Sequence, residues 1–79
     1  MSDLPPLPEL PLGLYRHYKG LDYEVLAVAR HSETLAPLVV YRALYGERGV
    51  WVRPFEMFVE TIEIDGRPQL RFARVQATA

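Results

Sequence analysis

Short runs of apolar residues, separated by turn-forming residues, follow one another from Gly13 onward. Within residues 22–30, Tyr23, Val25, Ala27 and Ala29 would share one face of an extended strand, because successive side chains of a strand point to opposite faces. Runs this short, rich in Tyr, Val, Leu and Ile, are typical of β-strands. We therefore predict strands over residues 14–18, 22–30, 38–45, 50–53, 59–64 and 70–75.

Turn signals divide these runs. Lys19-Gly20, Gly46–Gly49 and Asp65-Gly66 each place a glycine where a tight turn needs positive φ. Pro54 ends the strand before it and suits the first position of a helical turn over residues 54–58. That turn is too short to be stable unless an aromatic residue packs into the core.

The pattern predicts a mainly β fold with five or six short antiparallel strands and one helical turn. We expect a small SH3-like barrel over residues 13–75, because closing a sheet into a barrel removes its exposed edges. Residues 1–12 contain four of the seven prolines, which predicts a disordered proline-rich tail. We expect the last residues, 76–79, to fray.

The composition limits the function classes. The absence of cysteine excludes disulfides, thiolate nucleophiles and cysteine-based metal sites, and it fits a cytoplasmic protein. We expect no export signal and no membrane-spanning segment, because no apolar run has the required length. The net charge of −1 gives no general attraction to nucleic acid or anionic lipid.

Two groups of residues are candidates for ligand binding. The first is the polar stretch ARHSET, which contains Arg30, His31, Ser32, Glu33 and Thr34. The second combines Trp51 and Arg53, which share a strand face, with Tyr41 on the neighbouring predicted strand. An arginine beside flat aromatic side chains can hold an anion, a peptide carboxylate or a planar ring.

Several alternatives remain open for these residues. His31, Ser32 and Glu33 are the residue types of a hydrolytic triad, although adjacent side chains diverge in an extended chain, so Ser32 and Thr34 are better explained as turn formers. His17, His31 and Glu33 could in principle bind a metal, but no spacing brings them together, and we predict neither metal nor cofactor. The segment YRHYKG suits nucleic-acid binding, which the net charge does not favour.

The sequence also resembles a known bacterial family. The segments that carry the resemblance are YRHYKG (15–20), ARHSET (29–34), VYRALYG (40–46) and WVRPFEMF (51–58). They resemble the family catalogued as domain of unknown function 1653, over about residues 13–72. The resemblance implies a compact β-rich fold in a bacterial cytoplasmic protein, and it supplies no catalytic or binding residues.

We therefore predict a non-enzymatic binding module that recognises an anionic small molecule or peptide. Its predicted site is formed by Arg30–Thr34, Tyr41, Trp51 and Arg53. A nucleic-acid-binding module is the main alternative, and a small enzyme that uses His31, Ser32 and Glu33 is a weaker one. The partner is unknown, and we expect a monomer or a weak homo-oligomer with no membrane contact.

Overall fold

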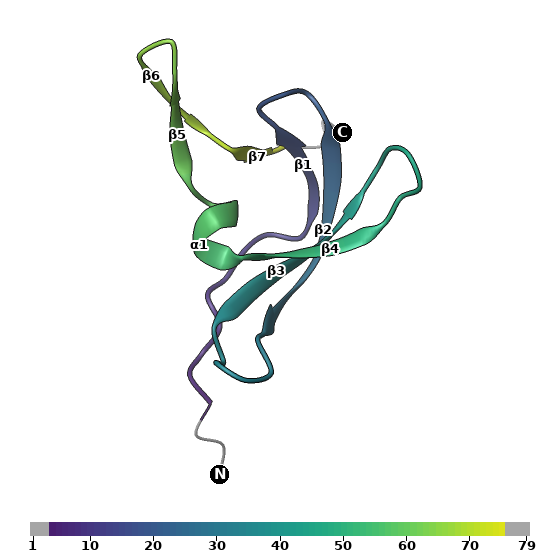
Figure 1. The fold of residues 1–79 in the computed structure, drawn as a ribbon, viewed down its shortest axis with the longest axis vertical. Helices are drawn as coiled ribbons and strands as arrows, with labels where there is room; N and C mark the ends of the chain where they lie inside the picture. The colour runs from purple at the N-terminus through teal and green to yellow at the C-terminus, as the bar shows by residue number, and fades with distance from the viewer. Residues whose placement is uncertain (1–3, 76–79) are drawn as a thin grey trace.

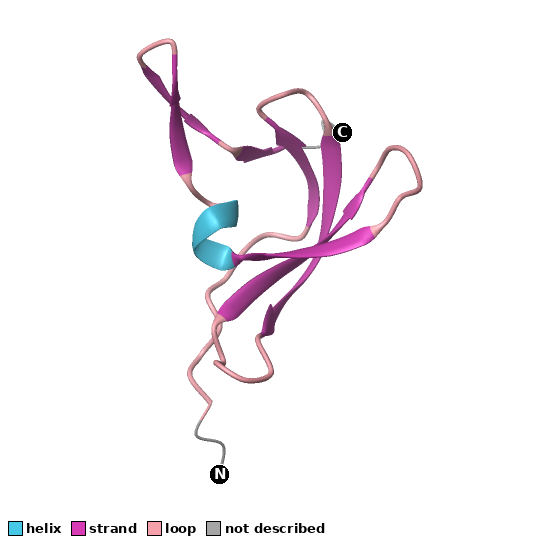
Figure 2. Cartoon of the chain, in the orientation of Figure 1, coloured by secondary structure: helices cyan, strands magenta, loops and turns pink. Residues whose placement is uncertain are grey.

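The computed structural model describes residues 4–75. They form two antiparallel sheets and one short helix (Figure 1). The elements are β1 (Gly13–His17), β2 (Asp22–Arg30), β3 (Pro37–Ala43), β4 (Val50–Pro54), α1 (Phe55–Phe58), β5 (Thr61–Ile64), β6 (Arg67–Leu70) and β7 (Phe72–Arg74). The larger sheet has the order β4-β3-β2-β1-β7, and β5 and β6 form a separate hairpin. The mainly β character and the helical turn are confirmed (Figure 2).

The first and last strands of the chain, β1 and β7, are neighbours in the larger sheet. β7 pairs with β1, with Arg74 opposite Tyr15. Beyond β7, the Val75 N–H donates to the Leu14 carbonyl at 2.9 Å. The first and last strands of the domain therefore lie side by side, although they are far apart in the sequence.

A β-bulge changes the predicted alternation of β2. The register with β3 shifts between Val25 and Ala27, so that Val28 rather than Ala27 pairs with Val39. Because a bulge inserts one extra residue, the side chains beyond it change faces. The single face predicted for Tyr23, Val25, Ala27 and Ala29 is therefore wrong beyond the bulge, at Ala27 and Ala29, and Ala27 is exposed.

The core lies between the larger sheet and α1. Val25, Val39 and Phe58 are almost completely buried. The ring of Phe58 stacks on that of Phe72, with centroids 4.2 Å apart and planes within 6°. One turn of helix is thus held by aromatic packing, as the sequence required.

The closed barrel expected from the sequence is not found. Within residues 4–75, β4 and β7 are the two edges of the larger sheet and do not pair with each other. The predicted strand over residues 70–75 is instead divided at Arg71, whose N–H donates to Glu60 at 3.0 Å and whose carbonyl accepts from Tyr18 at 2.9 Å. These bonds turn the chain from the hairpin into the sheet, which gives more strands than predicted.

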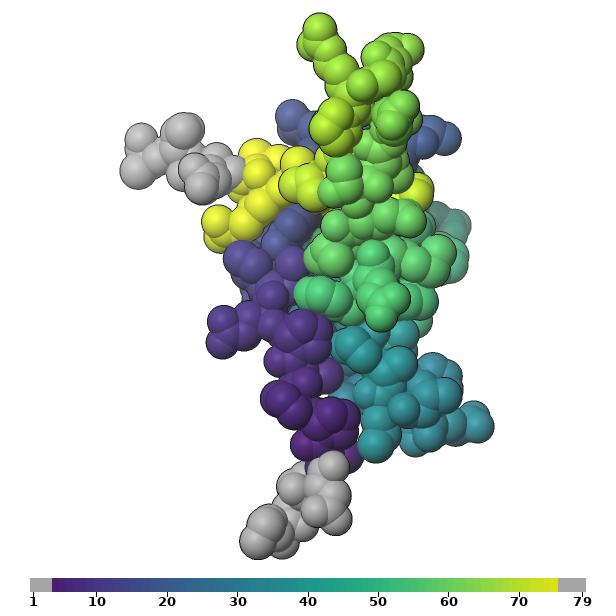
Figure 3. All heavy atoms as spheres, turned by 90° about the vertical axis from the view of Figure 1, so that its left-hand side faces the viewer, coloured from purple at the N-terminus to yellow at the C-terminus, as the bar shows by residue number. Residues whose placement is uncertain are grey.

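The described part of the predicted tail, residues 4–12, contains neither helix nor strand but contacts the sheet. Arg30 Nη2 donates to the Pro5 carbonyl at 2.9 Å, and the Tyr15 hydroxyl donates to the Pro11 carbonyl at 2.7 Å. Leu10 packs against the core cluster. Figure 3 shows this segment in purple beside the β2–β3 turn and below α1. The fraying expected at 76–79 lies outside the described residues.

Candidate functional site

The predicted site residues lie at two separate places on the sheet. Residues 31–36 form the turn between β2 and β3, and Arg30, the last residue of β2, pairs with Pro37. Tyr41 pairs with Trp51 four residues further along β3. Four residues of strand span about 13 Å. The structure therefore brings Tyr41, Trp51 and Arg53 together but leaves the ARHSET turn apart from them.

The ARHSET turn is closed by its own side chains. His31 Nδ1 accepts hydrogen bonds from the backbone N–H groups of Glu33 at 3.1 Å and Thr34 at 3.3 Å. Thr34 Oγ1 accepts from the Ala36 N–H at 3.2 Å. Across residues 4–75, the side chains of Ser32 and Glu33 make no hydrogen bond with the His31 ring, so the triad arrangement is not formed. Ligand binding by this turn stays a prediction.

A cluster of aromatic rings lies on the inner face of the sheet, toward the β3–β4 turn. The ring centroid of Tyr23 is 5.4 Å from that of Tyr41 and 5.5 Å from that of Tyr45. The hydroxyls of Tyr23 and Tyr45 share a hydrogen bond of 2.5 Å. Together with Trp51, these rings line a cavity of about 380 Å³, which we call the aromatic pocket.

The pocket is open to solvent on the side formed by β4. Trp51 is 61% exposed and Tyr45 is 42% exposed. Glu47 and Arg48, from the β3–β4 turn, complete the rim. A Cβ atom at Gly49 would lie 3.2 Å from Trp51 Nε1, so glycine at this position allows the indole to lie against the turn. The backbone thus helps to fix the position of an exposed tryptophan.

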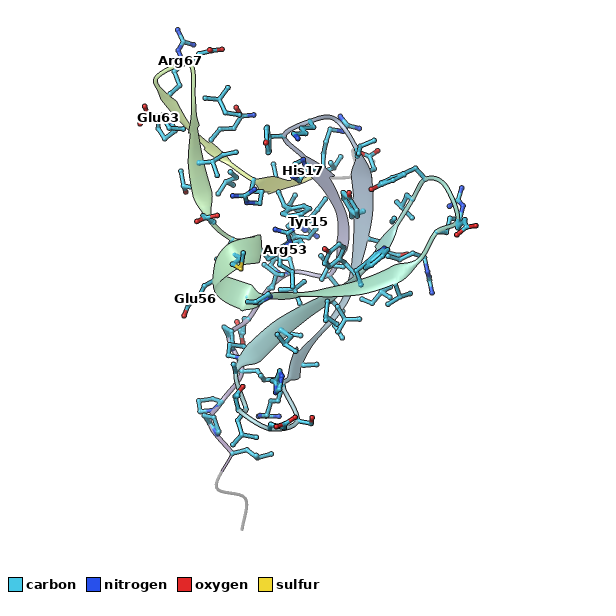
Figure 4. All side chains as sticks on the ribbon, viewed as in Figure 1. Tyr15, His17, Arg53, Glu56, Glu63 and Arg67 are labelled. Atoms are coloured by element: carbon cyan, nitrogen blue, oxygen red, sulfur yellow. The ribbon has the colours of Figure 1, made fainter. Side chains whose placement is uncertain are left out.

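Arg53 follows Trp51 on the same face of β4. Its guanidinium carbon lies 5.4 Å from the ring centroid of Phe72. Figure 4 shows Arg53, Tyr15 and His17 directed into the space between the sheet and α1. Arg53 has no hydrogen bond or ion pair with any residue of the described chain, 4–75. The other partly buried arginines have polar partners, namely Arg30 with Pro5, Arg42 with Glu24 and Arg71 with Glu60.

The protonation states on this face follow from burial and from the nearby cations. Burial, followed by the hydrogen bond with Tyr45, raises the pKa of Tyr23 to about 12, and Arg53 acts in the opposite direction. Burial also lowers the pKa of His17, and the positive charges of Arg71, Arg53 and Lys19 add to this effect. The inner face therefore presents neutral phenols and imidazole beside a positive guanidinium, which favours a negatively charged ligand.

Sequence reasoning did not identify Tyr23 and Tyr45 as site residues. Tyr23 pairs with Ala43, whose small side chain leaves room for the neighbouring rings. Tyr23 could have been found from its position two residues before Val25, because this spacing places both side chains on the same strand face. Val25 in turn pairs with Tyr41. Tyr45 follows β3 in the turn, where no strand pattern predicts its direction.

Residues 4–75 contain neither a metal-binding cluster nor a membrane-spanning helix. No group of three or more His, Asp or Glu side chains in this range could hold a metal ion. No helix in the same range is long and apolar enough to cross a membrane.

Comparison with known proteins establishes the family. The model of DUF1653, described as a protein of unknown function, matches residues 13–74. The chain belongs to the DUF1653 family. A DUF1653 protein from Bordetella bronchiseptica, known from a crystal structure, is 38% identical in sequence to this chain. The match covers 90% of this chain and 94% of that chain, with a TM-score of 0.79. No curated protein matches the chain. The family resemblance found in the sequence is confirmed.

Proposed function

We propose that this DUF1653 protein is a non-enzymatic binding module for an anionic peptide. The aromatic pocket receives an apolar or aromatic side chain of the peptide, and Arg53 binds a carboxylate next to it. The observation that carries the proposal is that a largely exposed Trp51 shares a strand face with a partly buried Arg53, which has no hydrogen bond or ion pair within residues 4–75.

The exposed aromatic rings favour a binding role. Tryptophan and tyrosine are enriched among the residues that contribute most to protein interfaces, because they bury much area and lose little conformational freedom. Exposing Trp51 to water forgoes part of the stabilisation that burial would give. A ligand side chain in the pocket would recover that stabilisation.

The state of Arg53 favours an anion. A charged group that is partly removed from water without a polar partner lowers stability, whereas a carboxylate can accept two hydrogen bonds from one guanidinium. Trp51 and Arg53 lie two positions apart on β4, so their Cα atoms are about 7 Å apart. An extended peptide can place an apolar side chain and the carboxylate of the next residue but one at this spacing.

The open shape of the pocket favours a peptide over a small molecule. Small-molecule pockets usually enclose most of the ligand surface. This pocket is bounded on one side by the exposed Trp51 and Tyr45, so an extended chain could enter and leave it. SH3-like barrels, the fold we expected, also bind peptides in aromatic-lined grooves, and the proposal retains that comparison. It also retains the cytoplasmic setting expected from the sequence.

The first test is a fluorescence titration. Trp51 is the single tryptophan of the chain, so its emission reports directly on the site. The probes are acetyl-Phe-Ala-Glu-amide and the matched neutral peptide acetyl-Phe-Ala-Gln-amide. We expect saturable quenching by the first, and binding about tenfold weaker for the second, because one charge-assisted hydrogen-bonded contact is lost.

Arg53→Gln should remove this discrimination between the two peptides. Arg67→Gln, on the distant β5–β6 hairpin, should retain it and serves as the control. Urea unfolding would verify that Arg53→Gln remains folded. Equal binding of both peptides by the wild-type protein, or unchanged discrimination in Arg53→Gln, would contradict the proposal. Stronger quenching by a short oligonucleotide than by either peptide would favour the nucleic-acid alternative.

A further inference from the structure

Within residues 4–75, the outer edge of β4 is apolar and has no neighbouring strand. β4 is a terminal strand of the larger sheet. Val50, Trp51 and Val52 are 51%, 61% and 58% exposed, respectively. Proteins usually protect such edges with charged side chains or a covering segment, because unpaired backbone groups bind other strands. This edge has its first charge at Arg53 and then ends at Pro54.

The register shows which backbone groups of β4 point outward. The Ala43 N–H donates to the Gly49 carbonyl at 3.0 Å. Since hydrogen-bonded pairs alternate along an antiparallel ladder, Trp51 and Arg53 bond to β3, while the backbone groups of Val50, Val52 and Pro54 point away from it. Pro54 lacks an N–H, but it lies at an outward-pointing position, where no hydrogen bond from its nitrogen to β3 is required.

We propose that β4 pairs with β4 of a second copy of this chain, antiparallel and with the twofold axis at Val52. This register overlaps the whole of Val50–Pro54. Val52 of each copy would exchange two hydrogen bonds with Val52 of the other. The Val50 N–H of each copy would donate to the Pro54 carbonyl of the second copy, so every outward-pointing backbone group of Val52 gains a partner and Pro54 has no donor left unsatisfied.

The side chains are complementary in the same register. Trp51 stands opposite Arg53 of the second copy on the inner face, an aromatic-cation pair that forms twice. Beyond the ends of the paired strands, the β3–β4 turn with Arg48 would come near the start of α1 with Glu56 of the second copy. Neither Arg48 nor Glu56 forms an ion pair within residues 4–75. This self-complementarity of charge favours a second copy over an unrelated strand.

The small size of the interface sets the expected affinity. One strand from each copy buries much less than the roughly 800 Å² per partner of a standard stable interface. We therefore infer a weak dimer, with a dissociation constant on the order of 0.1 mM. Each copy would contribute Arg53 to the edge of the other copy's Trp51.

Disulfide trapping tests this register. The chain has no cysteine, so Val52→Cys and Val50→Cys each introduce a single thiol at an exposed position. On the axis, the two position-52 Cα atoms would lie about 5.5 Å apart, within disulfide range. The two position-50 Cα atoms would be offset by four residues, about 13 Å, which is too far.

We expect Val52→Cys to form a disulfide dimer under mild oxidation at 0.5 mM protein, at least tenfold faster than Val50→Cys. Equal rates for the two variants, or no dimer of either, would overturn the proposal.

A second measurement reverses the charge of residues at the ends of the paired strands. Sedimentation equilibrium should show weaker association for Arg48→Glu and recovery in Arg48→Glu/Glu56→Arg, and failure of the double variant to recover would exclude the register. The disulfide test uses positions 50 and 52, which lie on the opposite strand face from Trp51 and Arg53, so its outcome is independent of peptide binding.

Discussion

At the scale of single residues, His17 links the core to the charged part of the inner face. Its ring contacts that of Phe72, with centroids 4.9 Å apart, and its Nδ1 accepts the Lys19 N–H at 3.2 Å. Burial and nearby cations lower its pKa, so the folded protein favours the neutral ring. Protonation would remove the acceptor for Lys19 and place a charge beside an aromatic core.

The stability of the protein should therefore depend on pH through His17. Its pKa is lower in the folded state than the unfolded value of about 6.5, so the unfolded state binds more protons. We expect the free energy of unfolding to be highest above about pH 7 and to fall as the pH drops through about 6.5. Urea unfolding between pH 5 and 8 would measure it.

His17→Gln is the comparison variant, because glutamine offers an acceptor but does not titrate in this range. Asp22, whose hydrogen bond to Arg16 lowers its pKa, also loses stabilisation in acid, and it does so equally in both proteins. The difference between the two curves isolates His17. Parallel curves would show that the ring makes no contribution.

At the scale of elements, the β2–β3 turn shows how a polar cluster can have a structural role. The side chains that suggested chemistry instead bond to the backbone of their own turn. Leu35, at φ 64°, occupies the left-handed region that non-glycine residues rarely adopt, and its N–H donates to the His31 carbonyl at 2.9 Å. The hydrogen bonds accepted by His31 Nδ1 and Thr34 Oγ1 offset the free-energy cost of this conformation.

His31→Ala should lower the free energy of unfolding by about 1 kcal/mol, as loss of a capping side chain does. His31→Asn should restore most of it, because asparagine can accept the same backbone N–H groups. Ser32→Ala, at an exposed position, should change stability little. Urea unfolding of the three variants would measure these changes in the free energy of unfolding. If His31→Ala and Ser32→Ala were equally stable, the turn would not depend on the imidazole.

The turn also shows what sequence could predict at this scale. Strand positions followed from alternation and turn signals, and Asp65 and Gly66 have the positive φ values, 52° and 77°, that a tight hairpin turn requires. The bulge after Val25 and the break at Arg71 could not be predicted. Both depend on backbone bonds to distant segments, which leave no local pattern.

At the scale of the whole molecule, the segment before β1 completes the core. Leu10 and Pro11 line a cavity of about 220 Å³ together with Tyr15 and Phe58. Without these two residues, the edge of Phe58 and the hydroxyl of Tyr15 would face solvent. Whether the segment moves in solution stays a prediction, but its contacts give it a role in stability.

Deleting residues 1–11 should therefore lower the free energy of unfolding by about 2–3 kcal/mol. Loss of the Leu10 contacts accounts for most of this effect, and loss of the carbonyl acceptors for Tyr15 and Arg30 for the rest. Glu9→Ala, at an exposed position of the same segment, is the control and should have little effect. Equal stability of the shortened protein and the Glu9→Ala variant in urea would show that the segment does not protect the core.

The sequence predicted only some of the neighbours among the candidate site residues, because the others depend on the fold of the whole molecule. Trp51, Arg53 and Tyr41 were correctly grouped because antiparallel neighbours could be inferred from a hairpin. Placing Tyr23 beside them requires the strand order, and separating the ARHSET turn from them requires the lengths of β2 and β3. Neither is encoded in a local stretch of sequence.

The hydrogen bond from Val75 to Leu14 has a consequence for protein architecture. Because the body of the domain is entered and left at adjacent points, it could be inserted into a surface loop of a host protein without separating the two ends of that loop. In such an insertion, residues 4–12 would remain as the incoming connection, because Leu10 and Pro11 complete the core.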